Sequence, residues 1–221
     1  IVFNSYLNKK FNSNHINRTG ITVTGLQYDL DYKISPNFGL DVPMEQISKG
    51  NGGSCVLSAY SSSVINLSNH LTTSLGITAQ YFTLNKNWTV EPRAALKWSF
   101  NPKHALALAY GLHSRREKLD YYFVEQEANG KTESNRYLDF SKAHHFGLTY
   151  DWNINSYMHL KVEPYYQYLF RIPVEENSSF SIINHQSFYL DRILKNRGSG
   201  VNYGIAVSYT HLRAHETSQD L

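Results

Sequence analysis

Apolar and polar residues alternate with a period of two over most of this chain. Between Val90 and Phe100 the even positions hold Val, Pro, Ala, Leu, Trp and Phe, and the odd positions hold Glu, Arg, Ala, Lys and Ser. Successive side chains of a β-strand point to opposite faces, so this segment would have one apolar and one charged face. A helix would mix the two sets, and the pattern therefore predicts a strand.

The same alternation recurs along the chain and predicts nine strands and no helix. It is clear in most segments and weakest at 54–66, where the neighbouring strands support the assignment. Pro164 falls inside one pattern and indicates a bulge or a weakly paired position. The predicted strands are 3–13, 20–34, 54–66, 70–84, 88–100, 104–116, 142–154, 157–171 and 198–210.

Short and long connections alternate between these strands. The long ones span 35–53, 117–141 and 172–197, and 85–87 is short where a long one is expected. Antiparallel strands in up-and-down order place all short turns at one end of a sheet and all long loops at the other. Membrane barrels show this asymmetry because their two ends face different compartments.

Two architectures fit alternating strands. A soluble or surface β-sandwich, here a binding protein, buries its apolar faces between two sheets. An outer-membrane barrel turns them toward lipid and encloses a polar lumen. Strands of 11–15 residues, aromatic side chains near strand ends, and small or charged residues on the polar face favour the barrel. We therefore predict an all-β, antiparallel, up-and-down transmembrane β-barrel. It is incomplete, because nine is odd and bacterial barrels have even strand numbers.

The alternation assigns side chains to the two faces of the predicted barrel. Charged residues on the polar face are candidate contacts of the lumen, a ligand or an interior domain. These are Asp29, Asp31, Glu91, Arg93, Lys97, Lys161 and Glu163. The predicted lipid-facing residues are Leu96, Trp98, Leu106, Leu108, Tyr110, Leu148, Tyr150, Trp152, Leu160 and Val162.

Composition narrows the function classes. The net charge of +3 in 221 residues is small and scattered, which argues against a nucleic-acid partner. The mean hydropathy of −0.44 and the absence of a long apolar run exclude a membrane helix. The single Cys55 excludes an internal disulfide. Aromatic residues make up 14% of the chain, as suits strands with one wet face.

Reactive residue types show no catalytic pattern. His144 and His145 are adjacent, so they point to opposite faces of a strand and cannot share one metal ion. Asp29 and Asp31 share a face about 7 Å apart, which could suit a cation, but hydrogen bonds to lumen arginines are the simpler interpretation. No nucleophile elbow or phosphate-binding loop occurs. We predict no enzyme activity, no metal site and no cofactor.

Three stretches resemble the barrel of TonB-dependent receptors of Bacteroidetes-type bacteria. They are LDFSKAHHFGLTYDW (138–152), LKVEPYYQYLFRIPV (160–174) and LKNRGSGVNYGI (194–205). The resemblance implies part of a 22-stranded barrel in the outer membrane that takes up a scarce nutrient such as an iron chelate, cobalamin or a glycan. It also implies a plug domain and an energy-transducing TonB complex, whose contact region we do not find in this sequence.

The C-terminal stretch departs from that family. VSYTHLRAHET, from Val207 to Thr217, resembles the translation of a sequencing adapter in one reading frame. We therefore expect a partial barrel domain at 1–206 and a non-native tail at 207–221. His211 and His215 have the spacing of helical metal ligands, but in such a tail the spacing carries no function.

Overall fold

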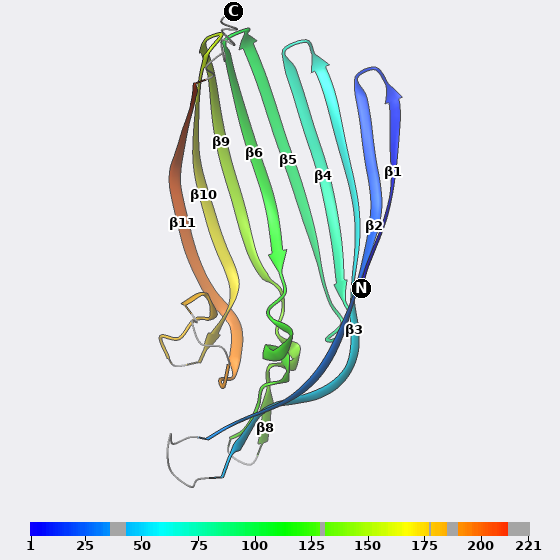
Figure 1. Cartoon of the computed structure of the whole chain (residues 1–221), viewed down its shortest axis with the longest axis vertical. Helices are drawn as coiled ribbons and strands as arrows, with labels where there is room; N and C mark the ends of the chain where they lie inside the picture. Colours follow the sequence, from blue (N-terminus) through cyan, green and yellow to red (C-terminus); the bar gives the residue numbers. More distant parts are fainter. Residues whose placement is uncertain (36–42, 129–130, 177, 185–189, 212–221) are drawn as a thin grey trace, which may run out of the picture.

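Nine long strands form one antiparallel sheet in the computed structural model, which describes residues 1–35, 43–128, 131–176, 178–184 and 190–211 (Figure 1). Each long strand pairs with those next to it in the chain, which confirms the predicted all-β, up-and-down order. In spatial order the strands are β1 (Val2–Asn12), β2 (His15–Ile34), β3 (Glu45–Ser68), β4 (Leu71–Phe82), β5 (Asn87–Asn101), β6 (His104–Arg115), β9 (Ser141–Asn155), β10 (Met158–Glu175) and β11 (Leu194–His211).

The connections divide by length between the two ends of the sheet. Two-residue turns join β1 to β2, β3 to β4, β5 to β6 and β9 to β10, at the top of Figure 1. The strand ends that are joined by the longer connections 35–44, 116–140 and 176–193 lie at the other end. The turn between β4 and β5 is the expected short exception there. The predicted end-to-end asymmetry is thus confirmed.

Some strands of the structure extend beyond the bounds that the alternation predicts. β3 begins nine residues before the predicted start at 54, and β10 continues to Glu175. The predicted boundary between Ala206 and Val207 falls inside β11, and residues 212–221 lie outside the described residues. The pairing of β10 keeps one register on both sides of Pro164, so no bulge forms there. The strand absorbs the proline with only local loss of pairing.

The connection between β6 and β9 is folded. It contains η1 (Leu119–Phe123), the hairpin of β7 (Glu125–Ala128) and β8 (Lys131–Ser134), and η2 (Asn135–Tyr137). A third 3-10 turn, η3 (Ile182–Asn184), precedes β11. Within the described ranges, these short 3-10 turns are all the helix there is, and none has the length or apolar character to cross a membrane.

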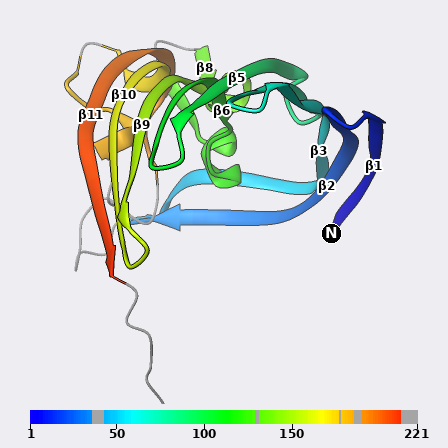
Figure 2. The same ribbon diagram turned by 90° about the horizontal axis from the view of Figure 1, so that it is seen from above.

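The sheet is curved like a trough, and the connection between β6 and β9 lies inside the curve (Figure 2). We call residues 117–140 the inward segment, and we call the two sides of the sheet the concave and convex faces. Tyr121, Tyr122 and Phe123 of the inward segment are buried against Val56 and Phe82 of the sheet. The core of this fold therefore lies on the concave face at the loop end.

Close packing ties the inward segment to β2 and β3. The rings of Phe123 and Tyr28 lie 4.6 Å apart, and Ser48 forms a backbone bridge to Val124. Gly50 leaves room for this contact, because a Cβ there would approach the Phe123 ring to 2.5 Å. Gly50 is therefore a position of close approach that a larger residue could not occupy without moving the ring.

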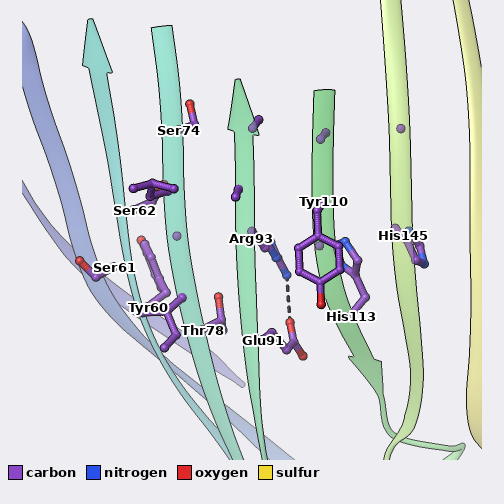
Figure 3. A pocket seen from close by; sticks show the side chains of 18 of the residues that line it. Tyr60, Ser61, Ser62, Ser74, Thr78, Glu91, Arg93, Tyr110, His113 and His145 are labelled. Carbon is purple, nitrogen blue, oxygen red and sulfur yellow. Dashed lines mark hydrogen bonds and ion pairs between the residues drawn. The ribbon is translucent and has the colours of Figure 1, made fainter. Parts of the chain in front are cut away.

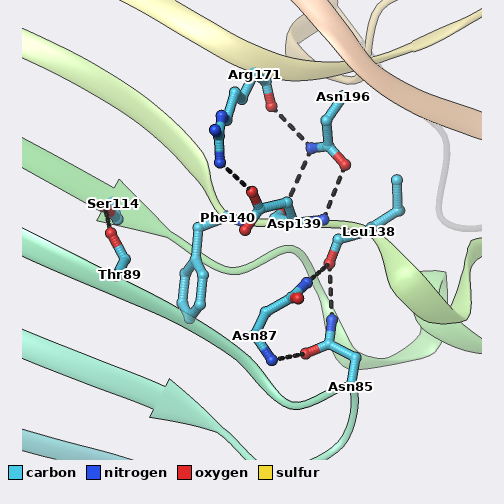
Figure 4. Close-up of polar contacts among 9 residues, drawn as sticks. All are labelled: Asn85, Asn87, Thr89, Ser114, Leu138, Asp139, Phe140, Arg171 and Asn196. Carbon is cyan, nitrogen blue, oxygen red and sulfur yellow. Dashed lines mark hydrogen bonds and ion pairs between the residues drawn. The ribbon is translucent and has the colours of Figure 1, made fainter.

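Side-chain amides tie the inward segment to the rest of the sheet (Figure 4). Asn85 and Asn87 both donate to the Leu138 carbonyl, at 2.7 and 3.1 Å. Asn196 accepts from the Asp139 backbone N–H at 2.8 Å. Asn135 is buried, donates to the Arg192 carbonyl and accepts from the Leu194 N–H, both at 2.8 Å. The segment thus links the middle of the sheet to its β10–β11 edge.

Candidate functional site

The strand register assigns each side chain of the sheet to a face. Phe82 and Asn87 are partners, and both contact the inward segment. The odd-numbered residues of β5 therefore share the concave face, and the even-numbered ones share the convex face. Because partners across an antiparallel sheet lie on the same side, this assignment extends from β5 to its neighbours.

All ten residues predicted to face lipid lie on the convex face. Leu96 is paired with Leu108, and Leu108 with Leu148. Trp98, Leu106, Tyr150 and Val162 make the adjacent row. The remaining members of the set, placed by the same register, are Tyr110, Trp152 and Leu160.

Two exposed tryptophans bound an apolar stripe on the convex face of β5. Trp88 is 68% and Trp98 is 51% exposed. They are ten positions apart, about 34 Å along a strand. At a tilt of about 40° this is about 26 Å along the barrel axis, close to the apolar band of about 25 Å of outer-membrane barrels. The residues between them on this face are Val90, Pro92, Ala94 and Leu96.

Aromatic side chains gather at two levels of the convex face. Near the two-residue turns, His104 stacks on Trp152 at 5.7 Å, and its Nδ1 lies 2.8 Å from the Tyr150 hydroxyl. Nearer the loop end, a second cluster contains Tyr110, His144, Phe146, Tyr166, Tyr168 and Phe170. The first cluster is in register with Trp98, as expected for an interface girdle. In the second cluster Tyr110 and Phe146 are in register with Ala94, within the apolar stripe.

Five of the seven predicted lumen residues lie on the concave face. Glu91, Arg93 and Lys97 are odd-numbered residues of β5. Glu163 Oε1 accepts a hydrogen bond from the Thr149 hydroxyl at 3.3 Å and pairs with the ammonium of Lys161 at 2.7 Å. The Lys161–Glu163 pair is well exposed, so it contributes little to stability.

Glu91 is the most enclosed charge of the concave face, with a side chain that is 2% exposed. Its Oε1 accepts from Gln80 Nε2 at 2.6 Å and from the Ser114 backbone N–H at 3.2 Å. Its Oε2 accepts from Arg93 Nη2 at 2.9 Å. Buried carboxylates need such partners, so this arrangement fixes the guanidinium of Arg93 beside a polar furrow.

That furrow runs across the concave face and has a volume of about 770 Å³ (Figure 3). The rings of His113 and His145 lie 4.4 Å apart on its wall. The sequence predicted that His145 faces away from His144, and the register confirms this. We did not predict that His113 and His145 meet, although both belong to polar sets on neighbouring strands. Other lining residues include Ser58, Tyr60, Ser62, Thr78 and Gln80.

The structure corrects the placement of Asp29 and Asp31. Both are exposed, and they alternate with Tyr28 and Leu30, which pack on the buried cluster of the concave face. The two aspartates therefore lie on the convex side, near the loop end. The alternation predicts the opposite face for both aspartates, because the apolar residues of this segment pack on the inward segment and not toward the outside.

The described residues contain no group of three or more His, Cys, Asp or Glu side chains placed to hold a metal ion. The furrow can instead offer hydroxyl, amide, guanidinium and imidazole groups to a polar ligand. Such groups suit the binding of a polar ligand.

Comparison with protein-family models gives no match, and comparison with curated proteins gives none. Solved structures do match. The FrpB iron transporter from Neisseria meningitidis, in its F5-1 apoprotein form, aligns with a TM-score of 0.64 at 10% identity, over 96% of this chain and 34% of that protein. The ferric-catecholate import receptor Fiu from E. coli K12 aligns with a TM-score of 0.65 at 10% identity, over 97% of this chain and 35% of that one.

The chain thus spans about a third of the length of the solved structures that it matches. Identities this low show the fold alone. The nine-stranded sheet has the fold of part of the β-barrel of these proteins.

Proposed function

We propose that this chain is part of the barrel of a TonB-dependent outer-membrane receptor that imports a scarce nutrient. The observation that carries the proposal is the convex face of β5, where an apolar stripe between Trp88 and Trp98 matches the thickness of the membrane. Large apolar side chains that stay exposed over a whole sheet face need lipid or a partner to cover them. The likeness to FrpB and Fiu supports the same assignment.

The furrow supplies the second half of the proposal. A barrel that faces lipid outside encloses its polar face, and the concave face carries Glu91, Arg93 and the two imidazoles of His113 and His145. In the complete receptor this face would surround a plug domain. The nutrient would enter from the long loops, and the TonB complex would supply the energy.

The finer assignments rest on the sequence resemblance. We propose a 22-stranded barrel of the Bacteroidetes type, located in the bacterial outer membrane, with an iron chelate, cobalamin or a glycan as the nutrient. Residues 207–221 would be foreign to it. We propose no enzymatic role. The alternative is a soluble or surface β-sandwich binding protein. It is not favoured, because in the described part of the chain the nine long strands form one sheet, and no second sheet is stacked on its apolar face.

Uptake by cells that express the full-length protein tests this function. The cells receive labelled ferric citrate, cyanocobalamin or a linear glucan oligosaccharide in turn, with and without a protonophore. An energised receptor predicts accumulation of one probe that stops when the proton-motive force collapses. Accumulation of none of them, or accumulation that is insensitive to the protonophore, would contradict the proposal.

A further inference from the structure

A second cavity of about 570 Å³ lies on the concave side, between the inward segment and β10. It shares His113 and His145 with the furrow, so the two cavities are neighbours on the concave face. We call it the loop-end pocket. Its place between the long connections and the furrow is where an incoming ligand would first meet the interior.

The lining of the loop-end pocket carries an excess of positive charge. Arg115, Lys118 and Lys142 line it, and Glu117 is the only acid among its lining residues. Glu117 is buried, and its Oε1 accepts the Ser141 hydroxyl. Glu117 is therefore held by the wall of the pocket and is not an exposed partner for the three cations.

Arg115 and Lys118 of this pocket have no carboxylate partner in the described part of the chain, whereas most other cations on the concave face and at the loop end form ion pairs. Arg93, Lys161, Arg171 and Arg192 each form an ion pair with a nearby carboxylate. Arg115 and Lys118 form none with any residue that the structure describes, and both are exposed. Lys118 lies over the ring of Tyr121 at 5.5 Å, which leaves its ammonium able to bind an anion.

Part of the pocket lining is apolar. Leu169, Ile172 and Ile182 contribute it, and Ile172 is buried. A site lined by two unpaired cations and by aliphatic side chains selects ligands that carry both an anionic and an apolar part. Charge-assisted hydrogen bonds would hold the anionic group, and the aliphatic side chains would take an aromatic or aliphatic body.

We infer that the loop-end pocket binds a ligand that carries a carboxylate or similar anionic group on an apolar or aromatic body. This inference rests on the proposed uptake function and narrows the class of nutrient. A neutral glycan has no anionic group for the two cations and no apolar body for the aliphatic side chains. Arg115 and Lys118 hold the anionic group. His113 and His145 line both this pocket and the furrow.

Calorimetric titration of the full-length protein in detergent with benzoate tests the inference, with benzamide as the uncharged probe of the same shape. We expect benzoate to bind at least about tenfold more tightly than benzamide. The double variant Arg115→Gln/Lys118→Gln should lose about tenfold in benzoate affinity. The exchange Arg115→Lys/Lys118→Arg, which keeps both charges, should retain most of it.

The control variant is Lys86→Gln, which removes an exposed charge at the same end of the sheet but outside the pocket. It should leave benzoate affinity within about twofold. Equal affinity for the two probes, no benzoate binding, or unchanged affinity in the double variant would overturn the inference. Because binding in detergent needs no energy source, benzoate binding without energised uptake would count against the proposed function alone.

Discussion

Ile77→Arg places a charge at the centre of the proposed lipid-facing band. Ile77 is 52% exposed on the convex face and pairs with Pro92, which lies about halfway between Trp88 and Trp98. If this face contacts lipid, the guanidinium replaces an aliphatic side chain at the bilayer midplane. If it contacts water, the same substitution changes an exposed position and costs almost nothing.

The expected loss in the free energy of unfolding depends on how deep in the bilayer the arginine lies. An arginine at the midplane of an outer-membrane barrel destabilises by about 2–4 kcal/mol, and one near the interface by about 0–1 kcal/mol. Leu71 supplies the matched control, since it lies on the same strand and face but pairs with Trp98 at the edge of the band. We therefore expect Ile77→Arg to exceed Leu71→Arg by about 2 kcal/mol in the free energy of unfolding.

Denaturant titration of the full-length protein in phospholipid vesicles measures this difference. Both variants add the same charge, so the difference between their free energies of unfolding reports the effect of depth in the bilayer alone. Equal and small losses in both variants would refute the membrane reasoning. A larger loss for Leu71→Arg would place the band at a different height on the sheet.

Three further predictions concern the interior. Glu91→Ala should destabilise by about 1–3 kcal/mol in the same titration, because the Ser114 N–H and the Gln80 amide lose their buried acceptor; no loss would contradict the network. Asn135→Ala should cost about 1–3 kcal/mol and speed proteolysis of the inward segment, and an unchanged cleavage rate would argue against its anchoring role. Burial raises the pKa of Tyr122 to about 12, so the neutral phenol is favoured in the fold. The stability that this group contributes should be complete below pH 10 and lost between about pH 10 and 12. Absorbance titration should show one tyrosine that ionises late and that is missing in Tyr122→Phe; its persistence in the variant would refute the assignment.

The strands and most of their faces could be predicted from the alternation alone. Leu96, Leu108 and Leu148 have the same parity, and they share one face of the sheet because no bulge interrupts the register between β5 and β9 over these rows. Period two is a local property, so it survives without knowledge of the partners.

The alternation shows that the two faces of a strand differ in polarity, but it does not show which face lies on the concave side of the sheet. Tyr28 and Leu30 are apolar residues that face inward because Phe123 and its neighbours cover them. That cover comes from a segment almost a hundred residues further along the chain, which no local pattern connects to β2. The error at Asp29 and Asp31 follows directly from this.

The furrow and the loop-end pocket could be predicted only in part. Glu91 and Arg93 were found because a charge in a strand pattern is conspicuous. The pairing of His113 with His145 depends on the register between β6 and β9, and these strands are separated by the inward segment. The cations Arg115 and Lys118 lie where a strand passes into a loop, and the period of two ends there.

Spin-label accessibility at two adjacent residues of β4 tests most directly whether the convex face contacts acyl chains and the concave face encloses water. Ile77→Cys and Thr78→Cys, each in the full-length protein with Cys55 replaced by Ser, place a label on either side of the same strand. The account predicts that the label at position 77 is relaxed by oxygen dissolved in the bilayer and the label at 78 by a water-soluble nickel chelate. Equal relaxation of both labels by the nickel chelate would contradict it.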